Sequence, residues 1–88
     1  DISGRPYLVF EGEFGRELVN DLATECVEDF FYSFCLNAKI TAHLEILQGR
    51  NDHHKIEALF KSFAYAMCKA AEIEARANGQ VPSTKGVL

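Results

Sequence analysis

"KITAHLEILQGRNDHHKIEALFKSF", residues 39–63, changes its hydrophobic period halfway along. Apolar and polar residues alternate over 39–47, which is typical of a β-strand with one buried face. Residues 49–52, Gly-Arg-Asn-Asp, favour a turn. Apolar residues then recur every three or four positions over 53–74, as in an amphipathic helix. This stretch alone therefore predicts a strand, a turn and a long helix, with Asn51 or Asp52 as the helix cap.

The rest of the chain repeats the same order of elements. Residues 7–14 read as a strand, and the period of three and four over 22–37 predicts a helix that starts near Thr24. Pro82 and Gly86 predict an extended tail over residues 81–88. The order strand, helix, strand, helix, tail predicts an α+β fold, a small β-sheet with two helices on one face.

Composition argues against several classes of function. The chain has 88 residues, enough for one small domain, and a net charge of −4 argues against a general nucleic-acid binder. We expect no membrane partner, because no apolar run has the length of a membrane span and none resembles a signal peptide. The three cysteines lack a C-x-x-C spacing, so we expect reduced thiols rather than a disulfide framework or a cysteine zinc site.

Two of the three histidines stand side by side at the start of the long helix. At about 100° per residue, His53, Glu57, Lys61 and His54 share one quadrant, beside the apolar stripe. Two imidazoles and a carboxylate suit a divalent metal such as Mn, Fe, Co, Ni or Zn, but a solvated first turn would show the same residues. Because adjacent side chains point about 100° apart, the two histidines are better placed to serve two ions than one.

Other candidates are weaker on the residues alone. His43 lies on the strand face opposite Ile40 and suits a structural or ligand-orienting role. Glu11 and Glu13 fit a solvated strand face. The tail Pro-Ser-Thr-Lys-Gly, residues 82–86, has hydroxyl, amide and ammonium donors for a phosphate, although on these residues alone an ordinary loop is the preferred interpretation.

Three runs together resemble one known family. "SGRPYLVF" (3–10), "GRNDHHKIEALFKSFAYAM" (49–67) and "VPSTKGVL" (81–88) resemble imidazoleglycerol-phosphate dehydratase of histidine biosynthesis, over all 88 residues. The resemblance implies a lyase, a hydro-lyase that dehydrates imidazole-glycerol phosphate to imidazole-acetol phosphate in the cytoplasm. Residues 1–88 match the second, C-terminal half of a duplicated fold similar to domain 2 of ribosomal protein S5.

The resemblance also implies roles for particular residues. His53, His54 and Glu57 match metal ligands for Mn²⁺, with two ions expected in each complete site. Glu57 and Lys61 match catalytic positions. The residues that match the binding site for the substrate phosphate are Arg5, Ser83 and Lys85.

One position departs from the family pattern. Where many members carry a histidine ligand in a Glu-His-Phe-Phe run, this chain has Asp29, whose role as a ligand is therefore in doubt. We also expect the first half and the strand before Asp1 to lie outside this sequence. The chain is then a fragment, or a half-sized relative that associates with itself or with the N-terminal half. Two functions remain open, the dehydratase itself and a non-catalytic metal-binding or assembly module.

Overall fold

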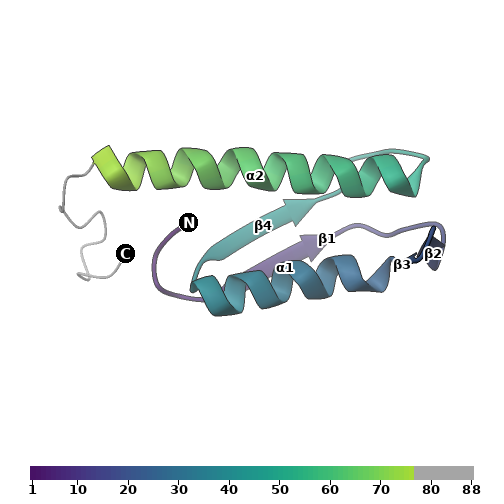
Figure 1. The fold of residues 1–88 in the computed structure, drawn as a ribbon, viewed down its shortest axis with the longest axis horizontal. Coiled ribbons are helices and arrows are strands. Elements are labelled where there is room, and N and C mark those ends of the chain that lie inside the picture. The colour runs from purple at the N-terminus through teal and green to yellow at the C-terminus, as the bar shows by residue number, and fades with distance from the viewer. Residues whose placement is uncertain (77–88) are drawn as a thin grey trace.

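The structure, a computed structural model, describes residues 1–76 and consists of a small sheet with two helices (Figure 1). The elements are β1 (Tyr7–Glu11), β2 (Leu18–Val19), β3 (Leu22–Ala23), α1 (Glu25–Ala38), β4 (Thr41–Glu45) and α2 (Asp52–Arg76). β1 and β4 pair in parallel, from Tyr7 opposite Thr41 to Glu11 opposite Glu45. The predicted order of the main elements and the α+β class are confirmed.

Both helices lie on the same face of the β1–β4 sheet, because one core cluster joins all four elements. The buried members are Val27, Phe31, Leu44 and Leu59, and the partly buried residues packed against them include Leu8, Phe10, Ile46 and Phe63. The alternation in β4 is as predicted, with Leu44 buried and His43 exposed. Two parallel strands need a crossover, which α1 supplies.

Phe31 lies at the centre of this core and is fully buried. Its ring is 6.5 Å from Phe10 of β1, measured between centroids, and 4.8 and 5.1 Å from Phe60 and Phe63 of α2. Aromatic pairs at these separations contribute about 0.5–1.5 kcal/mol each beyond the burial of area. One side chain of α1 therefore holds the sheet and α2 together.

The sequence analysis did not predict the short hairpin that precedes α1. β2 and β3 pair antiparallel, Leu18 with Ala23 and Val19 with Leu22. Asn20 takes a positive φ of 52° in the two-residue turn between them, a conformation that asparagine tolerates. Thr24 precedes α1 as expected, but its hydroxyl donates to the Arg16 carbonyl at 2.7 Å instead of capping the helix.

The loop after β1 passes very close to the end of β4. Gly12 has φ of 132°, and a Cβ added there would lie 2.7 Å from Cβ of Ile46. The Ile46 N–H donates to the Glu11 carbonyl at 2.8 Å across the same junction. Glycine is therefore required at this point, both for its φ and for the close approach.

Asp52 fixes this loop to the start of α2. Its carboxylate accepts the N–H of Gly15 at 3.0 Å and that of Arg16 at 2.7 Å, and Lys55 Nζ lies 3.5 Å away. The capping role goes to Asn51, whose Oδ1 accepts the His54 N–H at 3.1 Å. The Asp52 side chain is only 2 % exposed, so its partners are protein groups rather than water.

We predict that Asp52→Asn destabilises the metal-free protein, with a fall in Tm of at least about 4 °C for a domain of this size. The amide would place an N–H₂ group against a backbone N–H donor. The matched control is Asp21→Asn, the same change at an exposed aspartate, and thermal unfolding followed by circular dichroism measures both. Equal Tm values for the two variants would contradict the role given to Asp52.

The pH dependence gives a second readout of the same interaction. The Gly15 N–H is the main cause that lowers the pKa of Asp52 below its ordinary value, with Arg16 and Lys55 acting in the same direction. A carboxylate with a lowered folded pKa stabilises the fold above its unfolded pKa of about 3.9 and loses that contribution as the pH falls further. The difference in Tm between wild type and Asp52→Asn should therefore be full at neutral pH and shrink below about pH 4.

Candidate functional site

His53, Glu57 and Lys61 form a line along the exposed side of α2, four residues apart. His53 Nε2 lies 3.6 Å from Glu57 Oε1, and Lys61 Nζ donates to Glu57 Oε2 at 2.8 Å. Residues four apart on a helix are neighbours, so this arrangement follows from the spacing alone. The Glu57 carboxylate is thus held between an imidazole and an ammonium group.

His54 points in a different direction from His53. The ring centroids are 6.0 Å apart and the rings are almost perpendicular, at 82°. The two imidazoles therefore present their nitrogens to different regions of space. This geometry agrees with the divergence that the helical wheel predicts for adjacent residues.

The charge around Glu57 favours its ionised form. The hydrogen bond from Lys61 is the main cause that lowers its pKa, and the charge of Lys61 and the two histidines act in the same direction. A carboxylate binds metal when it is deprotonated, so Glu57 is in the state that a ligand needs. Lys61 holds only Oε2, and Oε1 faces His53.

The spacing of His53 and Glu57 suits two donors of one metal ion. Donors about 2.1 Å from a metal and at a tetrahedral angle lie about 3.4 Å apart, close to the separation of Nε2 and Oε1. Within residues 1–76, however, no three His, Cys, Asp or Glu side chains gather into a group that could hold an ion. The described part of the chain offers a partial ligand set, open on the solvent side.

A hollow of about 500 Å³ separates this line from the β2–β3 hairpin. His53 and Glu57 form one wall, and Asn20 and Asp21 of the hairpin turn form the other. The sequence analysis missed this wall, because it predicts no element over residues 18–21 and counts Leu22 in the helical period. The signal was present in Val-Asn-Asp-Leu, residues 19–22, where two turn-forming residues stand between apolar ones.

The network at the start of α2 sets the orientation of these residues. Asp52 and Asn51, which immediately precede His53, bond to backbone groups on both sides of the helix start. The first turn of α2 is therefore anchored to the loop that follows β1. Side chains on such a fixed helix keep their relative positions better than side chains on a loop.

The other predicted site residues lie elsewhere. Arg5 is exposed and precedes β1, beside Thr41, whose hydroxyl donates to the Arg5 carbonyl at 2.8 Å. α2 starts beyond the opposite end of the strands (Figure 1), and five strand residues at about 3.3 Å each place roughly 16 Å between the two ends. Arg5 and His53 are thus not brought together within one chain.

Two further residues, Asp29 and His43, also lie apart from the hollow. Asp29 is exposed on α1, whose buried positions are Val27, Phe31 and Cys35, and it does not line the hollow. His43 is exposed on the outer face of β4. Ser83 and Lys85 lie outside the described residues. No helix within residues 1–76 is long and apolar enough to cross a membrane.

Comparison with known proteins places the chain in a family. The sequence profile of imidazoleglycerol-phosphate dehydratase matches residues 1–67. Imidazoleglycerol-phosphate dehydratase of Clostridium botulinum (strain Alaska E43) is 54 % identical over the whole chain, which covers 44 % of that protein, and the protein of the same name from Chlorobium chlorochromatii is 52 % identical, with 43 % of it covered. This chain therefore spans less than half the length of these relatives.

A solved structure gives the same result for the fold. The crystal structure of imidazoleglycerol-phosphate dehydratase from Staphylococcus aureus N315 superposes with a TM-score of 0.69 and 49 % sequence identity, over 72 % of this chain and 37 % of that one. Identity at this level, together with the profile match, goes well beyond a shared architecture. The chain belongs to the imidazoleglycerol-phosphate dehydratase family.

Proposed function

We propose that this chain supplies part of the active site of a cytoplasmic imidazoleglycerol-phosphate dehydratase, which removes water from imidazole-glycerol phosphate to give imidazole-acetol phosphate in histidine biosynthesis. The observation that carries the proposal is the open line of His53, Glu57 and Lys61 with His54 beside it, in a chain 54 % identical to a relative of that name. These side chains are exposed, on a helix whose start is anchored by Asp52.

The donor set suits a pair of manganese ions. His53 and Glu57 would hold one ion and His54 the other, because the two rings face different directions. A bound metal pair supplies Lewis-acid stabilisation of the negative charge that develops in the dehydration. Since the described residues offer at most two donors to any one ion, the remaining ligands come from another half or another copy.

Lys61 has a separate role in this proposal. Without a metal its ammonium group neutralises Glu57 at 2.8 Å. When Glu57 turns toward a metal, the ammonium group becomes available to an oxygen of the substrate chain. Lys61 is too strongly cationic to serve as a ligand itself, so it positions substrate beside the metal ligands.

The phosphate of the substrate would be held by Arg5, Ser83 and Lys85. Arg5 precedes β1 and α2 follows β4, so the two are separated by the length of the strands, roughly 16 Å for five residues at about 3.3 Å each. Within one chain, Arg5 and His53 therefore lie at opposite ends of the strands. This separation supports a site shared between copies, in which one copy supplies metal ligands and another supplies a phosphate clamp.

A non-catalytic metal-binding or assembly module is the second candidate function. The observation that favours it is the incomplete ligand set in a chain covering 44 % of its relative. In this alternative the chain binds metal and associates, but no turnover follows. Assembly and activity measured together distinguish the two candidates.

Metal binding is the first prediction from this site. The double variant His53→Ala/His54→Ala should lose Mn²⁺ binding, with an affinity at least about a hundredfold weaker, because both ions lose their imidazole donor. Elemental analysis after dialysis, with calorimetric titration of Mn²⁺, provides the measurement.

The third histidine gives a matched control. His43→Ala removes an exposed imidazole on the outer face of β4, away from the hollow, and should leave the Mn²⁺ stoichiometry unchanged. If the double variant retained the wild-type stoichiometry, the ligand assignment would be wrong. If His43→Ala lost it as well, the binding would belong to exposed histidines in general.

Phosphate binding is the second prediction. Arg5→Ala and Lys85→Ala should each weaken the binding of inorganic phosphate by about tenfold, while the affinity for Mn²⁺ stays within a factor of two, because a lost charge-assisted hydrogen bond costs about 1.5–3 kcal/mol. Lys39→Ala, which removes a cation at the end of α1, is the control for non-specific charge. Equal losses of phosphate and Mn²⁺ in the Arg5 variant would contradict the separation of the two functions.

Assembly is the third prediction, and it separates the two candidate functions. Mn²⁺ should shift the chain to a larger oligomer and a chelator should reverse the shift, as measured by size-exclusion chromatography with light scattering. The dehydratase candidate expects turnover of imidazole-glycerol phosphate in the oligomeric fraction, whereas the module candidate expects none. A metal-saturated monomer would exclude a site shared between copies.

A further inference from the structure

The hollow beside the β2–β3 hairpin has a polar wall opposite the candidate metal ligands. His53 and Glu57 line the hollow from α2, whereas Asn20 and Asp21 line it from the turn of the hairpin. Within residues 1–76 the Asp21 side chain is exposed and makes no hydrogen bond or ion pair. A carboxylate that no structural contact requires therefore shares this space with the two candidate donors.

The rest of the hollow is apolar. The other residues that line it are Val19, Leu22 and Ile56. A cation is attracted by oxygen and nitrogen donors, and apolar side chains offer it none. A metal ion beside α2 would thus find side-chain donors only at the two polar walls.

The position of the hairpin turn is fixed relative to the start of α2. Asp52, which directly precedes the candidate ligands, accepts the Arg16 N–H at 2.7 Å, and the Thr24 hydroxyl donates to the Arg16 carbonyl at 2.7 Å. The Thr24 N–H donates to the Glu17 carbonyl at 2.9 Å, which closes the base of the hairpin. The two polar walls are therefore held by one connected set of hydrogen bonds, and their separation is built into the fold.

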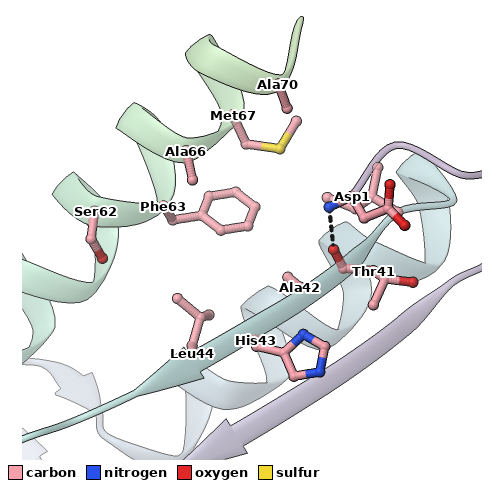
Figure 2. A pocket seen from close by; sticks show the side chains of 11 residues that line it. Asp1, Thr41, Ala42, His43, Leu44, Ser62, Phe63, Ala66, Met67 and Ala70 are labelled. Atoms are coloured by element: carbon pink, nitrogen blue, oxygen red, sulfur yellow. Dashed lines mark hydrogen bonds between the residues drawn. The ribbon is translucent and has the colours of Figure 1, made fainter. Parts of the chain in front are cut away.

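The hollows between β4 and α2 differ from the hairpin hollow. The larger, of about 420 Å³, lies between Ala42 and Leu44 on the strand and Phe63 and Met67 on the helix (Figure 2). A second, of about 380 Å³, continues along β4, and the small residues that line the two from α2 are Ala58, Ser62 and Ala66. The apolar walls in Figure 2 give a cation few donors, in contrast to the hairpin hollow.

The width of the hairpin hollow determines how Asp21 can act on an ion. A hollow of about 500 Å³ is roughly 8 Å across if its sides are equal, and it has the volume of roughly seventeen water molecules. An ion bound by His53 Nε2 and Glu57 Oε1 lies about 2.1 Å from each donor, so a gap remains between the ion and the hairpin. Within residues 1–76, no three acidic, histidine or cysteine side chains gather closely enough to hold an ion. Asp21 can therefore reach the ion through water but not directly.

We propose that Asp21 is a positioning residue of the metal site, whose carboxylate accepts a hydrogen bond from a water molecule bound to the ion that His53 and Glu57 hold. This inference rests on the proposed manganese site. Groups that orient the ligands of a metal raise its affinity, and their loss costs about tenfold to a hundredfold. The negative charge of Asp21 also attracts a doubly charged ion, which at about 8 Å in water corresponds to about a fivefold gain in affinity.

Three variants separate the charge of Asp21 from its shape and from the net charge of the chain. Asp21→Asn keeps the shape and removes the charge, whereas Asp21→Glu keeps the charge on a side chain one methylene longer. Glu72→Gln is the matched control for net charge. Its position, fifteen residues after Glu57 on α2, is about 22 Å away at about 1.5 Å per residue, well beyond the screening length of about 10 Å in 0.1 M salt.

The affinity for Mn²⁺ is measured by titration in 0.1 M salt, from the electron paramagnetic resonance signal of the free ion, and Tm is measured without metal. Asp21→Asn should weaken Mn²⁺ binding by about tenfold, whereas Asp21→Glu and Glu72→Gln should stay within about twofold of wild type. The metal-free Tm of Asp21→Asn should stay within about 2 °C of wild type, because the side chain has no structural partner among the described residues.

Several results would overturn the role of Asp21. Wild-type affinity in Asp21→Asn, or an equal loss in Glu72→Gln or Asp21→Glu, would show that its carboxylate does not act on the ion at this position. A loss of a hundredfold or more, equal to that of His53→Ala/His54→Ala, would make Asp21 a direct ligand. A metal-free Tm that fell together with the affinity would make the effect structural.

The same titration distinguishes this role from the metal site itself. If the wild-type chain bound no Mn²⁺, the proposed metal site would be wrong, and the role of Asp21 with it. If the wild type bound Mn²⁺ through its histidines and Asp21→Asn bound it equally well, the metal site would stand and only the role of Asp21 would fall.

Discussion

The packing of Phe31 is the constraint on which the rest of the structure depends. Its buried ring contacts Phe10 of the sheet and two aromatic rings of α2, so one residue of α1 sets the position of the long helix. A small domain has few such contacts, because its sheet has only two paired strands in the part described. Loss of this ring would remove the contact that joins the sheet to both aromatic rings of α2, and the helix would then depend on Leu59, on the remaining aromatic pairs and on the Asp52 anchor.

Asp52 fixes the end of α2 at which the candidate ligands lie. The aromatic contacts fix the middle of the helix, and the carboxylate fixes its first turn to the Gly15-Arg16 loop. The candidate ligands can then be fully exposed without becoming disordered relative to the core. This exposure would leave room for the further donors that the proposed shared site requires.

Sequence periodicity predicted the elements that bury one long, continuous face. It did not predict the short β2–β3 hairpin. The period of four in α1 and α2 and the alternation in β4 identified their elements because each buries one continuous face. β2 and β3 have two residues each, too few to show alternation, so the sequence pattern did not reveal the hairpin. The same error concealed the wall formed by Asn20 and Asp21, opposite His53.

Part of the candidate site was likewise predictable from the sequence, and part was not. The line of His53, Glu57 and Lys61 follows from helical spacing, so the sequence predicted it directly. The separation of Arg5 from His53 depends on the parallel pairing of β1 with β4, which no local pattern reveals. Asp52 was predicted as a candidate helix cap, and its bonds to a loop thirty-six and thirty-seven positions away appear only in three dimensions.

The two open surfaces of the molecule lie on different sides of α2, which makes them independent. At about 100° per residue, His53, Glu57, Lys61 and His54 span the first quadrant of the helix, whereas Ala58, Ser62 and Ala66 centre near 180°. The hollow beside the hairpin and the hollows beside β4 have no lining residue in common. An occupant of the hollows beside β4 would therefore leave the candidate metal ligands uncovered. The same rigid helix can then serve the core on one side and a shared site on the other, because its own position is already set by Phe31 and Asp52.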